Sequence, residues 1–179
     1  MKKVLILSAS PRKGGNSDTL CNKFMFGARE AGHEVEKIFL RDKNINSCVG
    51  CGLCTTNDYT ACSQKDDMEE ILQKMLAANV IVMATPVYFY AISGQMKTFI
   101  DRCCSRYTKL TNKEFYFIAT AADPNREALE NTFNDFRGFT ACLEGAVEKG
   151  TLYGCGVWAK DDVTRTQLLD EAYHMGLSV

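Results

Sequence analysis

Continuous apolar runs and runs of helical period alternate along the 179-residue chain. Apolar residues dominate 3–8 (KVLILS) and 79–84 (NVIVMA), as in strands that are buried on both faces of a parallel sheet. Two more strands are predicted at 114–121 (EFYFIATA) and 151–158 (TLYGCGVW). The segment 34–40 (EVEKIFL) alternates and is expected nearer an edge of the sheet. The pattern therefore predicts five strands.

Between these runs the apolar positions recur every three or four residues, which predicts helices with one buried face. Helices are expected over the following segments: 20–28, 68–76, 92–103, 125–148 with an interruption near Gly138, and 166–177. Strands that alternate with helices are typical of a doubly wound α/β fold, in which a parallel sheet carries helices on both faces. The length suits a single domain over 1–179.

Composition and charge exclude several kinds of partner. Hydrophobic residues make up 46% of the chain, charged residues 24%, and the net charge is −1. We therefore expect neither a nucleic-acid partner nor a membrane surface. Apolar runs such as 80–84 are far shorter than the roughly 20 residues of a membrane span, and no signal peptide precedes Val4. With nine cysteines in such a chain, a reducing compartment, the cytoplasm, is expected.

The segment 8–18 (SASPRKGGNSD) joins the first predicted strand to the first helix. Gly14 and Gly15 allow close approach of a ligand to the backbone, and Arg12 and Lys13 add positive charge. Because the N–H groups at a helix N-terminus attract anions, the segment predicts a phosphate site. The pattern G-x-x-x-x-G-K-[ST] is absent, which disfavours ATP or GTP. The alternative is a helix-capping turn without a ligand.

The same segment, read as S-x-S-P-R-x-x-G-N-S, resembles the FMN-phosphate loop of the flavodoxin-like NAD(P)H-dependent FMN reductase family. A second segment, TPVYFYAISGQMKTFIDR at 85–102, is similar to the loop of that family that contacts the isoalloxazine ring, and to the helix after it. The resemblance extends over nearly the whole chain. It implies a flavodoxin-like, five-stranded parallel sheet with the strand order 2-1-3-4-5.

The resemblance also implies which residues bind FMN. The phosphate would be held by Ser8, Ser10, Arg12, Asn16 and Ser17. The ring would be lined by Pro86, Val87, Tyr88 and Phe89. A third loop, ATAAD at 119–123, contains Ala121, and its small residues would let backbone N–H groups reach the pyrimidine edge of the ring. For the aromatic residues and for this third loop, packing within the core is the alternative.

Four cysteines, Cys48, Cys51, Cys54 and Cys62, have the spacing C-x2-C-x2-C-x7-C within a segment, 41–65, that lacks clear periodicity. Four thiolates at this spacing can ligate one [4Fe-4S] cluster, and the motif is similar to that of the iron-sulfur flavoproteins, a branch of the same fold. A tetrahedral zinc ion and a loop without metal are the alternatives. No redox pair is expected between Cys103 and Cys104, since neighbouring side chains on a helix diverge.

The resemblance implies an FMN-dependent oxidoreductase that takes electrons from NADH or NADPH and passes them to a small acceptor such as a flavin or a quinone. FMN would carry the chemistry, so no catalytic side chain is expected. The first alternative is an iron-sulfur flavoprotein electron carrier with a [4Fe-4S] cluster on the cysteine loop. A flavodoxin-type carrier usually has a strongly acidic face, and the net charge of −1 argues against it. The family resemblance further implies a homodimer or homotetramer.

Overall fold

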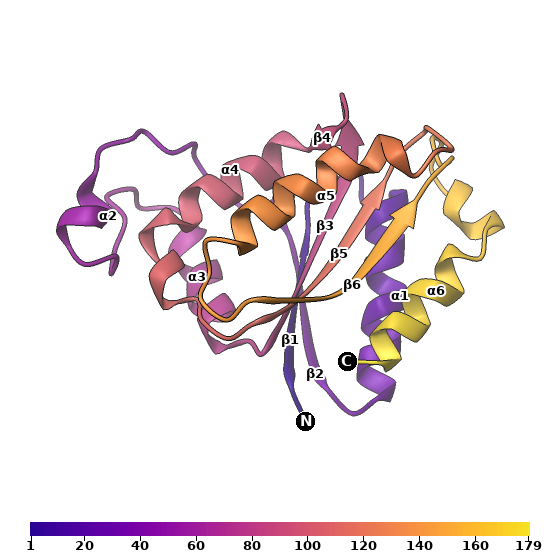
Figure 1. The fold of residues 1–179 in the computed structure, drawn as a ribbon, viewed down its shortest axis with the longest axis horizontal. Helices are drawn as coiled ribbons and strands as arrows, with labels where there is room; N and C mark the ends of the chain where they lie inside the picture. The colour runs from indigo at the N-terminus through magenta and orange to yellow at the C-terminus, as the bar shows by residue number, and fades with distance from the viewer.

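The computed structural model describes residues 1–179 and has a parallel sheet at its centre (Figure 1). The strands are β1 (Lys3–Ser8), β2 (Glu34–Phe39), β3 (Val80–Tyr88), β4 (Ala91–Ile92), β5 (Glu114–Thr120) and β6 (Val147–Gly154). They pair in the order β2-β1-β3-β5-β6, and every pairing along this path is parallel. The short β4 pairs antiparallel with the end of β3. With β4 set aside, the predicted order 2-1-3-4-5 is confirmed.

The position of each strand in the sheet explains its sequence. In the interior strand β1 every residue after Lys3 is buried, and in the central strand β3 the first six residues are buried. Side chains that are covered on both faces need no polar alternation, hence the continuous apolar runs. Burial in β2 is interrupted by exposed positions because β2 is an edge strand. The prediction of an edge position for 34–40 is confirmed.

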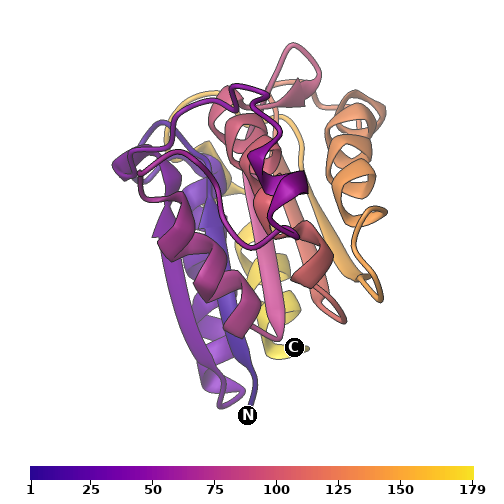
Figure 2. The same ribbon diagram turned by 90° about the vertical axis from the view of Figure 1, so that its left-hand side faces the viewer.

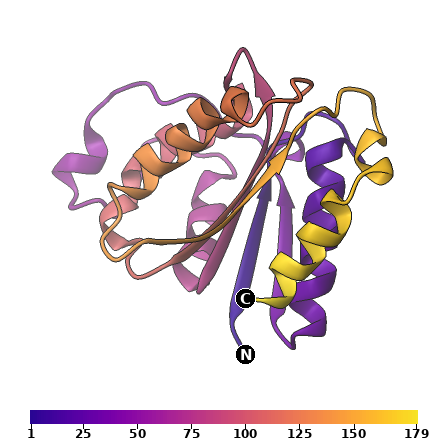
Figure 3. The same ribbon diagram turned by 45° about the vertical axis from the view of Figure 1, so that its right-hand side comes forward.

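Helices cover both faces of the sheet (Figures 1 and 3). The longer helices are α1 (Asn16–Glu30), α3 (Met68–Ala77), α4 (Gly94–Arg102), α5 (Glu127–Thr140) and α6 (Leu168–Leu177). One face is covered by α1 and α6, and the other by α3, α4 and α5. The short helical turns are η1 (Leu40–Asp42), α2 (Leu53–Thr56), η2 (Cys103–Ser105), η3 (Tyr107–Lys109) and η4 (Asp162–Arg165). None of the helices is long and apolar enough to cross a bilayer.

Several boundaries differ from the prediction. The last strand begins at Val147, four residues before the prediction, because Val147, Glu148 and Lys149 are exposed at the sheet edge and give no continuous apolar signal, and it ends at Gly154. The helix predicted over 125–148 is shorter: α5 continues through Gly138, whose missing side chain faces open space and costs only about 1 kcal/mol, but it ends at Thr140, because the chain turns there to begin β6 at Val147. Helix α4 starts after Ser93, whose hydroxyl accepts a hydrogen bond from the N–H of Met96, so Ile92 belongs to β4.

Candidate functional site

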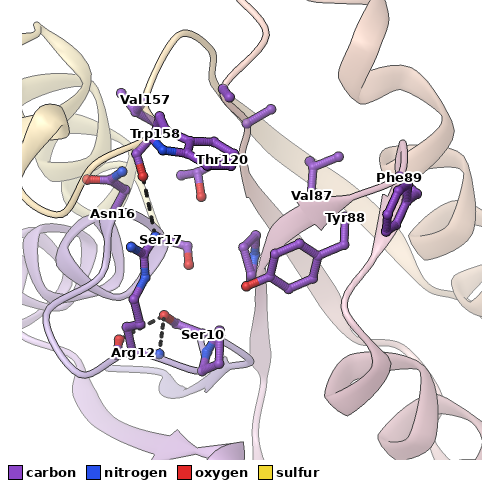
Figure 4. A pocket seen from close by; sticks show the side chains of 14 residues that line it. Ser10, Arg12, Asn16, Ser17, Val87, Tyr88, Phe89, Thr120, Val157 and Trp158 are labelled. Carbon is purple, nitrogen blue, oxygen red and sulfur yellow. Dashed lines mark hydrogen bonds between the residues drawn. The ribbon is translucent and has the colours of Figure 1, made fainter.

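A cavity of 530 Å³ opens at the carboxyl ends of β1, β3 and β5 (Figure 4). This strand-end cavity lies where ligands bind in open α/β sheets, and its volume suits a small molecule or cofactor. Fourteen residues line it: Ser10, Pro11, Arg12, Asn16, Ser17, Pro86, Val87, Tyr88, Phe89, Thr120, Ala121, Ala122, Val157 and Trp158. Nine of the ten residues expected to contact FMN are among them, and Ser8 is not.

The turn between β1 and α1 is shaped by Ser10 and two glycines. The Ser10 hydroxyl accepts a hydrogen bond from the N–H of Arg12 (3.2 Å) and donates one to its carbonyl (2.8 Å). A Cβ at Gly15 would lie 2.8 Å from the Ser10 Oγ and 3.0 Å from the Arg12 carbonyl, so no larger residue fits there. Gly14 has a φ of +67°, a conformation that glycine adopts without strain.

Asp18, in the first turn of α1, fixes the turn between β1 and α1 through hydrogen bonds, a role that the sequence did not reveal. Its buried carboxylate accepts hydrogen bonds from the N–H of Gly14 (3.0 Å) and the hydroxyl of Ser8 (3.2 Å). Lys37 of β2 forms an ion pair with it at 2.7 Å, and the Lys37 side chain is only 20% exposed. Ser8 is therefore fully buried and directs its hydroxyl to Asp18, away from the strand-end cavity.

The N-terminus of α1 faces the strand-end cavity with unused donors. Its N-cap residue, Gly15, has no side chain to satisfy the N–H groups of the first turn. Ser17, in that turn, lines the cavity, and its side chain is nearly buried. A helix of 15 residues places the positive end of its dipole here. An uncapped helix N-terminus of this kind is a setting that favours an anion.

Arg12 and Asn16 bind a distant part of the chain, residues 156–165. The Arg12 guanidinium donates to the carbonyl of Trp158 (3.4 Å), and the Asn16 amide donates to that of Ala159 (2.9 Å). Asn16 also accepts a hydrogen bond from the N–H of Val163 (3.3 Å). These contacts hold Trp158, the single tryptophan of the chain, beside the cavity with 78% of its surface exposed. The sequence predicts a strand over 151–158 and gives no sign that Trp158 lies at this cavity.

A strained hairpin forms the opposite wall. Val87 pairs with Ile92 and Tyr88 with Ala91, which leaves Phe89 and Tyr90 as a two-residue turn. Both turn residues have positive φ values, 51° and 61°, as in a type I′ turn, where Asn-Gly is preferred. Figure 4 shows Tyr88 extending toward the turn that carries Ser10 and Arg12, while Phe89 stands at the hairpin tip, fully exposed.

The third expected loop contributes Thr120, Ala121 and Ala122 to the cavity. The N–H of Ala121 donates to the carbonyl of Gly154 (2.9 Å), and its carbonyl accepts from the N–H of Val157 (2.8 Å). The amide of Ala121 is thus used to hold β6 and the segment after it. A backbone donor for a ligand has to come from a neighbour such as Ala122, whose N–H is not used by the sheet.

The cysteine loop, residues 41–65, projects outside the helical layer of α3 and α4 (Figures 1 and 2). A buried ion pair closes its base. The guanidinium of Arg102 in α4 donates two hydrogen bonds to the carboxylate of Asp66 (2.7 and 2.9 Å) and one to the carbonyl of Asn46 (2.7 Å). Both side chains are at most 1% exposed. The hydrogen bonds from Arg102 hold the pKa of Asp66 well below its usual range.

The four cysteines of the loop border one cavity of 200 Å³, together with Cys104 of η2. No three His, Cys, Asp or Glu side chains of the chain converge on a single-ion site. The hydroxyl of Ser63, 3.2 Å from the thiol of Cys51, lowers the pKa of that thiol. The Sγ atoms of Cys54 and Cys104 lie 3.7 Å apart, and burial together with this hydrogen bond raises the pKa of Cys104 to about 11.

Curated relatives include several iron-sulfur flavoproteins. One from Methanocaldococcus jannaschii is 32% identical over 166 residues, which cover 89% of this chain and 83% of that protein. Another, from Archaeoglobus fulgidus, is 41% identical over 102 residues, which cover 57% of this chain and 45% of that protein. The chain thus matches about half the length of several of these relatives.

Solved structures share the fold. An NAD(P)H:quinone oxidoreductase from Methanothermobacter marburgensis matches with a TM-score of 0.76 at 19% identity, covering 99% of this chain and 95% of that chain. An FMN-dependent NADH-azoreductase from Bacillus anthracis, solved with FMN, matches with a TM-score of 0.73 at 17% identity, covering 98% of both chains. The family model of the NADPH-dependent FMN reductases matches residues 2–147. This range includes the turn between β1 and α1 and the aromatic hairpin, the β3–β4 hairpin that carries Tyr88, Phe89 and Tyr90. This protein therefore belongs to the NADPH-dependent FMN reductase family of flavodoxin-like oxidoreductases.

Proposed function

We propose that the strand-end cavity binds FMN, with the phosphate at the N-terminus of α1 and the ring between the aromatic hairpin and Trp158. One observation carries this proposal: a single 530 Å³ cavity joins an uncapped helix N-terminus to two aromatic side chains, Tyr88 and Trp158. The first-turn N–H groups and the Ser17 hydroxyl supply donors for a dianion. The guanidinium of Arg12 lies within reach and adds a charge-assisted contact.

The chain's residues also prepare the site in other ways. Asp18 and Ser10 hold the turn in place, so its amides are oriented before a ligand arrives. Asn16 anchors residues 156–165, which keeps Trp158 beside the cavity. Ser8 donates a hydrogen bond to Asp18, so Ser8 and Asn16 both act in this proposal as positioning residues. The first-turn N–H groups, Ser17 and Arg12 contact the phosphate.

The proposed reaction is the transfer of electrons from NADH or NADPH through FMN to a small acceptor such as a flavin or a quinone. FMN supplies the redox chemistry when bound. The chain's own part is to hold the ring, leave one face accessible and exclude water from the other. Tyr88 and Phe89 at the hairpin shape access for the nicotinamide, because they stand at the open side of the cavity. Membership of the reductase family supports this direction of electron flow.

The iron-sulfur electron carrier remains the second candidate function, favoured by the cysteine loop and by relatives named iron-sulfur flavoproteins. Cys48, Cys51, Cys54 and Cys62 surround one cavity without converging on one point. A cluster needs thiolates spread around it, whereas zinc needs them about 2.3 Å from a single ion. The donor set therefore suits a [4Fe-4S] cluster better than zinc. These four cysteines would hold it.

A homodimer or homotetramer belongs to the same proposal. The fully exposed Phe89 and the largely exposed Trp158 leave two aromatic side chains uncovered beside the strand-end cavity. Light scattering of the purified protein measures the oligomeric state. A monomer at all concentrations would contradict this part of the proposal.

Comparing FMN with riboflavin tests the phosphate site directly, since the two differ only in the phosphate. We expect FMN to bind at least tenfold more tightly. Ser17→Ala should weaken FMN binding about tenfold, the loss of one charge-assisted hydrogen bond, and leave riboflavin binding unchanged. The measurement is fluorescence titration of the apoprotein. Equal affinity for both flavins would contradict the placement of the FMN phosphate at the N-terminus of α1.

Iron analysis of anaerobically reconstituted protein tests the cluster. We expect about four irons per chain and broad visible absorbance beneath the flavin bands. Cys51→Ala should lose the iron and keep FMN, because no residue of the cysteine loop lines the strand-end cavity. Iron-free protein after reconstitution would contradict the carrier function and leave the reductase proposal intact.

A further inference from the structure

A fifth cysteine, from outside the C-x2-C-x2-C-x7-C motif, reaches the cavity beneath the cysteine loop. Cys104 lies in η2, directly after α4, and borders the same 200 Å³ cavity as the four loop cysteines. Its Sγ is 3.7 Å from the Sγ of Cys54, which is carried by the short helix α2. Fifty residues separate the two cysteines, so their contact is a product of the fold.

We propose that Cys54 and Cys104 form a disulfide when the metal-free cysteine loop meets a peroxide. A disulfide bond is about 2.05 Å long, so the two sulfurs have to approach by about 1.7 Å. That movement is within the reach of a side-chain rotation on a loop whose cysteines are exposed or half-buried. The proposal goes beyond the flavin reaction and does not depend on it.

The chemistry needs one peroxide and no other reactant. The peroxide oxidises one thiol to a sulfenic acid and releases one water. The second thiol then attacks the sulfenic sulfur, the S–S bond forms, the S–O bond breaks, and the hydroxyl leaves with the remaining thiol proton as a second water. The two sulfurs together lose two electrons, which the peroxide accepts.

The surroundings of the other thiols favour this pair. Cys103, next to Cys104, is fully buried in the core and directs its side chain away from the loop cavity. The thiol of Cys51 contacts the hydroxyl of Ser63 and, unlike that of Cys54, has no hydrogen bond with another thiol. The buried pair of Arg102 and Asp66 fixes the base of the loop against α4, and η2 begins at the next residue, which keeps α2 close to η2.

Two consequences follow from such a bond. It would tie the cysteine loop covalently to the end of α4. It would also withdraw Cys54 from the four thiols, so the oxidised loop could not hold a cluster with all four of them. Peroxide oxidation and metal binding would therefore exclude each other at this loop.

The test uses the full chain, stripped of metal with a chelator and treated with a stoichiometric amount of hydrogen peroxide. Remaining thiols are alkylated, and tryptic peptides are mapped by mass spectrometry without reductant. Trypsin leaves the four loop cysteines in 44–65 and Cys104 in 103–106, so fragmentation of the linked peptide assigns the partner cysteines. We expect a Cys54–Cys104 link, the loss of two free thiols per chain, and full recovery with a thiol reductant.

Matched variants make the assignment specific. Cys104→Ser and Cys54→Ser should each abolish the linked peptide, whereas Cys142→Ser, which removes an exposed cysteine elsewhere, should leave it unchanged. A disulfide between two cysteines of the loop in the wild-type protein would overturn the proposal. So would oxidation of Cys51 or Cys54 to sulfinic acid without any link to Cys104. Neither result bears on flavin binding, which is measured separately.

Discussion

At the scale of single residues, the hairpin tip shows strain at the proposed flavin site. Phe89 and Tyr90 both adopt left-handed backbone conformations, which cost about 1–2 kcal/mol per residue relative to the usual regions. Phe89 gains nothing from burial in return, since it is fully exposed. An aromatic pair kept in an unfavourable turn is expected where the rings serve a ligand or a partner.

Replacing this pair with Asn-Gly separates stability from function. Phe89→Asn with Tyr90→Gly should raise the free energy of unfolding by about 2 kcal/mol, because both residues suit a type I′ turn. The same variant should slow reduction of bound FMN by NADH or NADPH. Urea unfolding and stopped-flow absorbance measure the two effects. As a control, Phe26→Gln removes an exposed aromatic from a helix and should not stabilise the protein. An unchanged or lower stability of the hairpin variant would refute the strain argument.

At the scale of elements, the cysteine loop depends on the ion pair at its base. Asp66 and Arg102 are buried together, and Asp66 also accepts a hydrogen bond from the N–H of Asn46 (3.0 Å). The main cause of the lowered pKa of Asp66 is hydrogen bonding from Arg102. The pair therefore stabilises the folded protein fully above the unfolded pKa of about 3.9, and this contribution is lost as the pH falls through the lower folded value.

Asp66→Asn tests this account through the pH dependence of stability. Near pH 7 the variant should lose about 3 kcal/mol of unfolding free energy, because Arg102 is left buried without its counter-charge. Its stability should also fall less steeply than that of the wild type as the pH drops below about 4. Urea unfolding across this range gives both quantities. Asp66→Asn with Arg102→Met should recover part of the loss. If the unfolding free energies of the wild type and Asp66→Asn fell in parallel as the pH drops, the stabilising role given to the ionised Asp66 would be contradicted.

At the scale of the whole molecule, local patterns predicted the sheet and much of the strand-end cavity. Continuous apolar runs identified β1 and β3, and the turn at 8–18 and the aromatic hairpin meet because strand ends share one edge of the sheet. Contacts between distant segments had no local signature. Asp18 looks in sequence like any acidic residue of a first helical turn, and its bonds to Gly14 and Lys37 arise only in the fold.

Contacts between distant segments also explain why the sequence did not predict the positions of Trp158, Ser8 and Cys104. Trp158 reaches the strand-end cavity through hydrogen bonds to Arg12 and Asn16, and the sequence separation of more than 140 residues hides this contact. Ser8 matches the phosphate-loop pattern, yet it turns to Asp18 because a buried carboxylate requires donors. Cys104 meets Cys54 for an equally non-local reason: η2 follows α4, against which the loop is fixed.

Anaerobic stopped-flow of the FMN-loaded protein with NADH or NADPH in excess tests the central claim most directly. The strand-end cavity is proposed to hold FMN with one ring face open to a nicotinamide, and hydride transfer needs the reacting atoms about 3–3.5 Å apart. We therefore expect at least one nucleotide to bleach the flavin absorbance within seconds to minutes, with recovery when a quinone is added. Bleaching by dithionite but by neither nucleotide would contradict the reductase function.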